Sequence, residues 1–147
     1  MVTEFDDVLR DFVNQLNETM MDGRGGVGIA APQVGNFIRV VIVDVSSKKN
    51  TPSHGHLVLV NPEITKWEGM QKGREGCMSV PDFTGNVIRA ERINLTAYDV
   101  FGEQQQYNMQ GFEARAVQHE MDHLDGLLFL DRLVSKRHDL FERKVYK

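Results

Sequence analysis

The stretch "GFEARAVQHEMDHLDG" (residues 111–126) is the part of the sequence that decides the fold. Its pattern predicts a helix over residues 111–124, and Gly126 stands where a glycine in the left-handed conformation would end that helix. His119 and His123 are four residues apart within it. Positions i and i+4 differ by about 40° around a helix and roughly 6 Å along it, so both imidazoles share one face. The spacing predicts that the two imidazoles bind one metal ion.

Glu120 follows His119 directly and therefore points about 100° away from it around the helix. A carboxylate at that angle reaches a water molecule on the metal more readily than the metal itself, which is how His-Glu-x-x-His hydrolases arrange their general base. Two surface histidines can share a helix face by chance, but an intervening glutamate near a helix end favours a catalytic site. The motif predicts His119 and His123 as metal ligands and Glu120 as the general base.

A catalytic metal site of this kind normally has three protein ligands and one open position. Glu142 is the only glutamate that follows Glu120, and it stands in a polar tail. The loop histidines, His54 and His56, are expected to be solvated. Cys77 stands in "REGCMSVP", flanked by glycines and a proline; a lone cysteine is most often a small buried apolar residue, but this segment is unlike a plain strand interior. The residues alone leave Cys77 and Glu142 open as third ligand.

Composition narrows the classes of protein. The 147 residues suit a single domain, 1–147, with a real hydrophobic core. A net charge of −4 and the lack of a polybasic run argue against nucleic acid or an anionic membrane as a partner. The apolar runs are too short to span a bilayer, and we see no secretory signal. One cysteine fits a reducing compartment, so we expect a cytoplasmic protein, or an organelle protein whose transit peptide is absent from this chain.

The remaining elements follow from periodicity. Residues 3–21 predict an amphipathic helix with Thr3 as its N-cap, and its apolar positions are Phe5, Val8, Leu9, Phe12, Val13 and Leu16. Strands are expected at residues 37–45, 57–61, 63–69, 87–100 and 104–110, with a turn at Phe101 and Gly102 before the last of them. Residues 131–147 are expected to form a short terminal helix. This order predicts an α+β fold with antiparallel β-sheets packed around a central helix carrying His-Glu-x-x-His, and with an N-terminal amphipathic helix.

Three segments then resemble a known family. "GVGIAAPQ" (residues 26–33), "EGCMS" (75–79) and "QHEMDHLDG" (118–126) are similar, in the same order, to the signature segments of peptide deformylases. The resemblance extends from the first helix to about Val134. It implies an enzyme that hydrolyses the N-terminal formyl group from formyl-methionyl peptides of nascent proteins and releases formate. Two alternatives stay open: a metallopeptidase that uses Glu142, and a non-enzymatic metal-binding or ribosome-interaction module descended from deformylases.

The resemblance also implies the metal centre. Cys77, His119 and His123 would be the ligands of one divalent ion, and Glu120 would be the general base and acid. Fe²⁺ is the ion that the family typically uses, with Zn²⁺, Ni²⁺ or Co²⁺ accepted. The implied partners are the N-formylmethionyl peptide and the ribosome near its exit tunnel, for a monomer that binds neither nucleic acid directly nor a membrane.

The remaining roles concern the substrate. The side-chain amide of Gln33 and the backbone N–H of Met78 would donate to the negative charge that forms on the formyl oxygen, and one such donor typically contributes about 3 kcal/mol to lowering the barrier. Gly26, Val27 and Gly28 would pair with the peptide backbone in the manner of an added strand. Glycines beside a substrate allow close backbone approach.

Two further expectations concern the surroundings of the site. By analogy with the family, Arg89 and Glu75 are expected to form a buried pair behind the loop. Met109, Phe112 and Arg115 are expected to border a pocket for the first side chain of the peptide.

Overall fold

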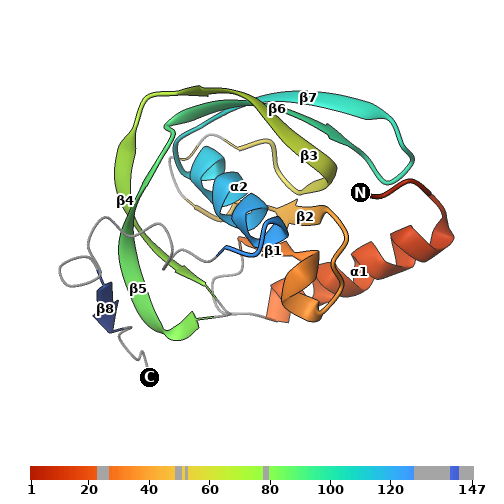
Figure 1. Cartoon of the computed structure of the whole chain (residues 1–147), viewed down its shortest axis with the longest axis horizontal. Coiled ribbons are helices and arrows are strands. Elements are labelled where there is room, and N and C mark those ends of the chain that lie inside the picture. The colour runs from red at the N-terminus through yellow and green to blue at the C-terminus, as the bar shows by residue number, and fades with distance from the viewer. Residues whose placement is uncertain (23–26, 49–50, 52, 78–79, 128–139, 143–147) are drawn as a thin grey trace.

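The strands form two antiparallel sheets with a helix between them (Figure 1). The computed structural model describes residues 1–22, 27–48, 51, 53–77, 80–127 and 140–142, and at 77, 80–83 and 140–142 it describes the backbone only. The elements, in chain order, are α1 (Asp7–Asp22), β1 (Gly28–Ala30), the 3₁₀ helix η1 (Ala31–Val34), β2 (Val40–Val43), β3 (Leu57–Glu68), β4 (Gln71–Cys77), β5 (Val80–Arg89), β6 (Arg92–Tyr98), β7 (Gln104–Gln110), α2 (Gly111–Leu124) and β8 (Leu140–Glu142).

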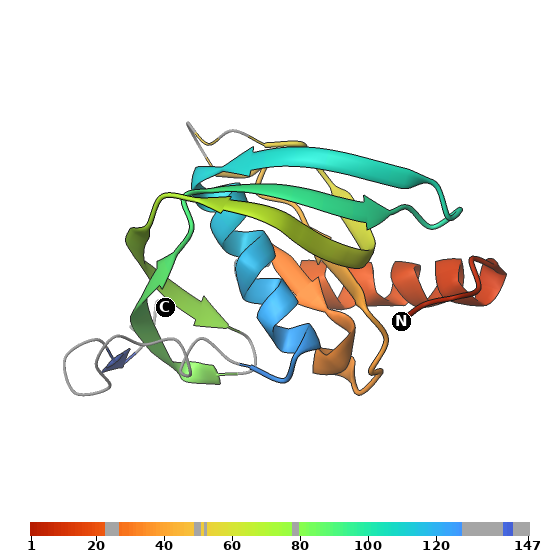
Figure 2. The ribbon, with the colours of Figure 1, turned by 45° about the horizontal axis from the view of Figure 1, so that its top comes forward.

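The larger sheet has the strand order β1-β2-β3-β6-β7, and the smaller has the order β4-β5-β8. Helix α2 lies between them, whereas α1 covers the other face of the larger sheet at β1 and β2 (Figure 2). The predicted α+β class, the central helix with its motif and the N-terminal helix are confirmed. That residues 1–147 form a single domain stays a prediction. Among the described residues, no helix has both the length and the apolar character needed to cross a lipid bilayer.

Strand β2 explains why its sequence is apolar at every position. Side chains alternate between the two faces of a strand. Val40 and Ile42 pack in the cluster that contains α1, while Val41 and Val43 pack in the cluster that contains α2, and all four are fully buried. A helix on each face therefore requires the continuous β-branched run that predicted a buried strand.

Helix α1 begins later than predicted. The Asp6 side chain accepts a hydrogen bond from the backbone N–H of Leu9 at 3.0 Å, which is the N-cap interaction, so the expectation for Thr3 is wrong. The buried face of α1 carries Leu9, Val13, Leu16 and Met20. Val8, expected on that face, is 77% exposed.

Two predicted strands, 57–61 and 63–69, are one strand, β3. Asn61 lies at their junction with a φ of 50°, in the left-handed region that asparagine tolerates better than most residues. Its side chain accepts from the Val2 N–H and donates to the Val2 carbonyl oxygen, both at 2.8 Å. The backbone therefore changes direction at Asn61, but strand β3 continues beyond it. The two bonds to Val2 also attach the N-terminal residues to the sheet.

The predicted strand over 87–100 is instead two strands in different sheets, β5 and β6 (Figure 2). The chain crosses from one sheet to the other at Ala90 and Glu91. The Gln118 side chain on α2 accepts from the Ala90 N–H at 3.0 Å and donates to the Ala90 carbonyl oxygen at 2.8 Å. The backbone N–H and the carbonyl oxygen of Ala90, where the chain leaves one sheet for the other, are therefore both hydrogen-bonded by a side chain of α2.

Other connections agree with expectation except in the tail. The hairpin between β6 and β7 turns at Phe101 and Gly102, where Gly102 has a φ of 84°. Residues 140–142 form strand β8 and pair antiparallel with β5, so the terminal helix expected over them is wrong. The rest of that tail lies outside the described residues.

Candidate metal centre

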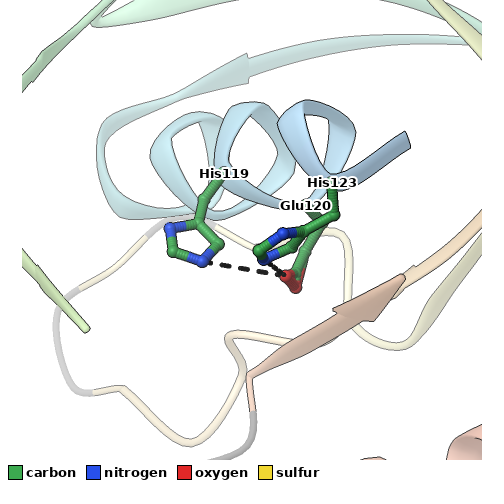
Figure 3. Close-up of side chains that lie close together, drawn as sticks. All are labelled: His119, Glu120 and His123. Carbon is green, nitrogen blue, oxygen red and sulfur yellow. Dashed lines mark ion pairs between the residues drawn. The ribbon is translucent and has the colours of Figure 1, made fainter. Parts of the chain in front are cut away.

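Helix α2 brings His119, Glu120 and His123 together as a buried group (Figure 3). One ligand atom from each of the three lies within 4.8 Å of the others. The Glu120 Oε1 atom is 3.6 Å from His123 Nε2 and 4.0 Å from His119 Nε2. The imidazole rings have centroids 5.0 Å apart and are nearly perpendicular. Two imidazole nitrogens therefore face one carboxylate, and all three side chains are buried.

The end of α2 keeps His123 inside the helix. Gly126 has a φ of 78°, and its N–H donates to the His123 carbonyl oxygen at 3.1 Å. The N–H of Leu127 donates to the Asp122 carbonyl oxygen at 2.9 Å. These two bonds form a Schellman motif, in which the left-handed residue is usually glycine. The predicted helix end at Gly126 is confirmed.

Glu75 on β4 orients His119. The Nδ1 atom of His119 lies 2.8 Å from Glu75 Oε1. Burial alone would raise the pKa of Glu75, but hydrogen bonds from His119 and Arg89 outweigh it and lower the pKa to about 2. An ionised carboxylate can only accept, so Nδ1 donates a proton to it, and in the neutral imidazole Nε2 then holds the lone pair. This is the state in which an imidazole binds a metal ion, so the residues present fit a metal.

Two buried arginines hold Glu75. Arg89 donates from Nε at 3.0 Å and from Nη2 at 2.9 Å, and Arg115 donates from Nη1 at 2.6 Å. Arg89 also pairs with Asp122, so two carboxylates and two guanidinium groups balance in charge. Burial would lower the pKa of Arg89, but its bonds to Glu75 and Asp122 raise it instead. The predicted Glu75–Arg89 pair is confirmed.

The pocket expected around Met109, Phe112 and Arg115 is not borne out. Met109 is 2% exposed and belongs to the core, and Phe112 packs against the same cluster. Arg115 is bound to Glu75 and to backbone carbonyl oxygens of β4 and β5. The sequence analysis did not assign these contacts of Arg115 or the contact of Gln118 with Ala90. The signal for Arg115 was its place four residues before His119 on one helix, whereas no local pattern points from Gln118 to Ala90.

Gln33 lies in the 3₁₀ helix η1, which follows β1. Its Oε1 atom accepts a hydrogen bond from the Ala30 N–H at 2.8 Å. The acceptor end of the amide is thereby engaged with the backbone, and the NH₂ end is the donor end. This orientation suits a side chain expected to donate to a developing negative charge.

Gly28 lies directly against Glu120. A Cβ atom at Gly28 would be 2.8 Å from both Cγ and Oε2 of Glu120. Strand β1 is an edge strand of the larger sheet, and the Val27 carbonyl oxygen accepts from the Asp44 N–H at 2.8 Å. Gly26 and Met78, also expected at the site, lie outside the described residues.

The two candidates for the third ligand, Cys77 and Glu142, both lie on strands of the smaller sheet. The backbone of Cys77 ends β4 two residues after Glu75, and its side chain lies outside the described part of the structure. Glu142 is on β8, where it pairs with Phe83. His54 is bonded to Glu113, and His56 is exposed and bonded to Asn17, so neither belongs to the buried group on α2.

Comparisons with known proteins agree with this geometry. A sequence profile described as polypeptide deformylase matches residues 1–139. Peptide deformylases from Acidobacterium capsulatum and Wolinella succinogenes are each 41% identical over 99% of this chain, which covers 84% and 86% of their lengths.

Solved structures agree as well. A peptide deformylase from Thermotoga maritima has a TM-score of 0.81 and 36% identity, covering 91% of this chain and 86% of its own. One from Acinetobacter baumannii with Met-Ala-Ser bound has a TM-score of 0.82 and 41% identity, covering 89% and 87%. A profile match over nearly the whole chain, relatives at about 40% identity and the His-Glu-x-x-His group between two sheets leave one assignment: this chain belongs to the polypeptide deformylase family.

Proposed function

We propose that His119, His123 and Cys77 hold one divalent metal ion and that Glu120 is the general base and acid. The protein is a peptide deformylase, a metal-dependent hydrolase that removes the formyl group from nascent peptides. The observation that carries the residue assignment is the Glu120 carboxylate lying within 4.0 Å of both Nε2 atoms, with His119 oriented from behind by Glu75.

The donor set fits a divalent ion. Two imidazoles and a thiolate suit several first-row metals, and availability decides among them. Family resemblance favours Fe²⁺, with Zn²⁺, Ni²⁺ or Co²⁺ able to replace it. Cys77 is supported as third ligand because it lies on β4 two residues after Glu75, and the Glu75 side chain contacts His119. When bound, the metal supplies Lewis-acid activation of the formyl group and of the attacking water.

Glu120 transfers a proton from the attacking water to the leaving amine. Its carboxylate accepts a proton from the water that attacks the formyl carbon. The same proton then passes to the amine nitrogen of methionine as the carbon–nitrogen bond breaks, so the products are formate and the free peptide. Burial of Glu120 at 3% exposure keeps bulk water from competing for that proton.

Two of the signature segments, residues 26–33 and 75–79, bind and stabilise the substrate. The amide NH₂ of Gln33 and the backbone N–H of Met78 donate to the formyl oxygen as negative charge develops there. Gly26, Val27 and Gly28 pair with the peptide backbone, and the edge position of β1 supports such strand addition.

The setting of the enzyme follows from its substrate. A formyl-methionyl terminus exists on a chain that is being synthesised, so we expect action in the cytoplasm, or in an organelle, near the ribosomal exit tunnel. We further expect a monomer. Equilibrium sedimentation and co-sedimentation with ribosomes test these two expectations separately.

The decisive experiment is formate release from formyl-Met-Ala-Ser by protein purified without oxygen, together with metal analysis. Glu120→Ala should retain the metal and lose turnover, while Cys77→Ala should lose the metal. Glu113→Gln is the matched control, because Glu113 is another buried glutamate on α2 that bonds only His54 among the described contacts, and it should retain turnover. Full turnover in Glu120→Ala would exclude the proposed base, and full metal content in Cys77→Ala would favour Glu142.

A further inference from the structure

Arg115 is a buried cation one helical turn before His119. It is 9% exposed, and its guanidinium connects α2 to both strands of the β4–β5 hairpin. Its Nη1 atom donates to Glu75 Oε2 at 2.6 Å and to the Val87 carbonyl oxygen at 3.0 Å, and its Nη2 atom donates to the Gln71 carbonyl oxygen. Because these three acceptors lie in different directions, the guanidinium group is held in one position.

Gly73 is the place on β4 where that guanidinium rests. A Cβ atom at Gly73 would lie 2.8 Å from Cζ and 2.9 Å from Nε of Arg115. Contacts of that length essentially never occur, and a guanidinium held by three acceptors cannot move aside easily. Gly73 does not have a positive φ, so the glycine is required by the close approach of Arg115 and not by the backbone conformation.

The Glu75 carboxylate receives two hydrogen bonds on each oxygen. Oε1 accepts from Arg89 and from His119, whereas Oε2 accepts from Arg89 and from Arg115. Arg89 is shared with Asp122, so it does not belong to Glu75 alone. The bond from Arg115 therefore fixes the side of the carboxylate opposite His119, and with it the plane in which Oε1 meets Nδ1.

We propose that Arg115, seated on Gly73, is a positioning residue for the metal ligand His119 and acts through Glu75. The inference rests on the proposed role of His119 as a ligand. Arg115 and His119 project from the same face of α2, four residues apart, so Glu75 spans both and transmits the position of one to the other. A supporting partner of a metal-ligating histidine typically contributes 10- to 100-fold to metal affinity.

The test compares Arg115→Met, Arg115→Lys, Gly73→Ala and the Gly73→Ala/Arg115→Met double variant. Three experiments are carried out on the folded proteins: chelator competition for the Zn²⁺ dissociation constant, the visible spectrum of the Co²⁺ form, and steady-state kinetics for kcat and KM with formyl-Met-Ala-Ser. Arg92→Met is the matched control, because Arg92 is a surface arginine whose partner, Glu68, is also on the surface.

Arg115→Met and Gly73→Ala should each weaken Zn²⁺ binding by 10- to 100-fold and change the Co²⁺ spectrum, with the loss of activity falling mainly on kcat. Arg115→Lys keeps the charge without the planar fork and should recover only part of the affinity. Gly73→Ala should have little further effect when residue 115 is Met, because the clash is gone. Arg92→Met should match the wild type.

Wild-type Zn²⁺ affinity and Co²⁺ spectrum in Arg115→Met, or in Gly73→Ala if the first variant does not fold, would overturn the proposal. If Gly73→Ala weakened Zn²⁺ binding equally in the wild-type and Arg115→Met proteins, the proposed contact between Gly73 and Arg115 would not be the cause. Failure of the proposed function is distinguished by His119→Ala, which would then retain full Zn²⁺ affinity.

Discussion

Gly28→Ala should displace Glu120 without disturbing the histidines. The new Cβ atom would stand 2.8 Å from Cγ and Oε2 of Glu120, whereas an ordinary van der Waals contact of a Cβ atom is 3.4–4 Å long. The Glu120 side chain must therefore move by about 1 Å, and a misplacement of that size in a catalytic group can cost about 100-fold in rate. We expect kcat for formyl-Met-Ala-Ser to fall by about 100-fold while metal content stays at the wild-type level.

A thermodynamic cycle separates this clash from any other effect of alanine at position 28. Gly28→Ala should lower the free energy of unfolding in the wild type, measured by urea denaturation. In the Glu120→Ala background the opposing side chain is absent, so the same substitution should cost little. Wild-type kcat in Gly28→Ala, or an equal loss of stability in both backgrounds, would refute the reasoning.

Further predictions concern other parts of the molecule. Gln33→Ala removes the donor that we propose for the formyl oxygen and should lower kcat about 100- to 1000-fold with the metal retained, as steady-state kinetics and metal analysis can check. The pKa of Glu75 is lowered from 4.5 to about 2, so its ionised form contributes about 3 kcal/mol of stability that is present above pH 4.5 and is lost as the pH falls towards 2. The difference in unfolding free energy between the wild type and Glu75→Gln should shrink over that interval; a constant difference would contradict it. Asp6→Ala should lose about 1 kcal/mol in urea denaturation, because the N–H of Leu9 loses its cap. Dialysis against a chelator should abolish formate release, and added Co²⁺ should restore it, as a formate assay before and after each step can check.

Local sequence determined the parts that depend on neighbours along the chain. Helix α2 and its end at Gly126 follow from periodicity and from the conformational preference of glycine, so the helix bounds could be predicted. The placement of His119 and His123 on one face, with Glu120 about 100° from His119, follows from the same 3.6-residue period. The burial of β2 on both faces was also visible in its unbroken β-branched run.

Tertiary structure alone decided the parts that depend on residues far apart in the chain. The switch from β5 to β6 takes place where Gln118 satisfies Ala90, and no local pattern over residues 87–100 marks that point. The orientation of His119 depends on Glu75, which is 44 residues away, and the position of Glu120 depends on the missing Cβ of Gly28. Periodicity reports which face of an element is buried but not what packs against it, because that contact forms only when distant segments meet.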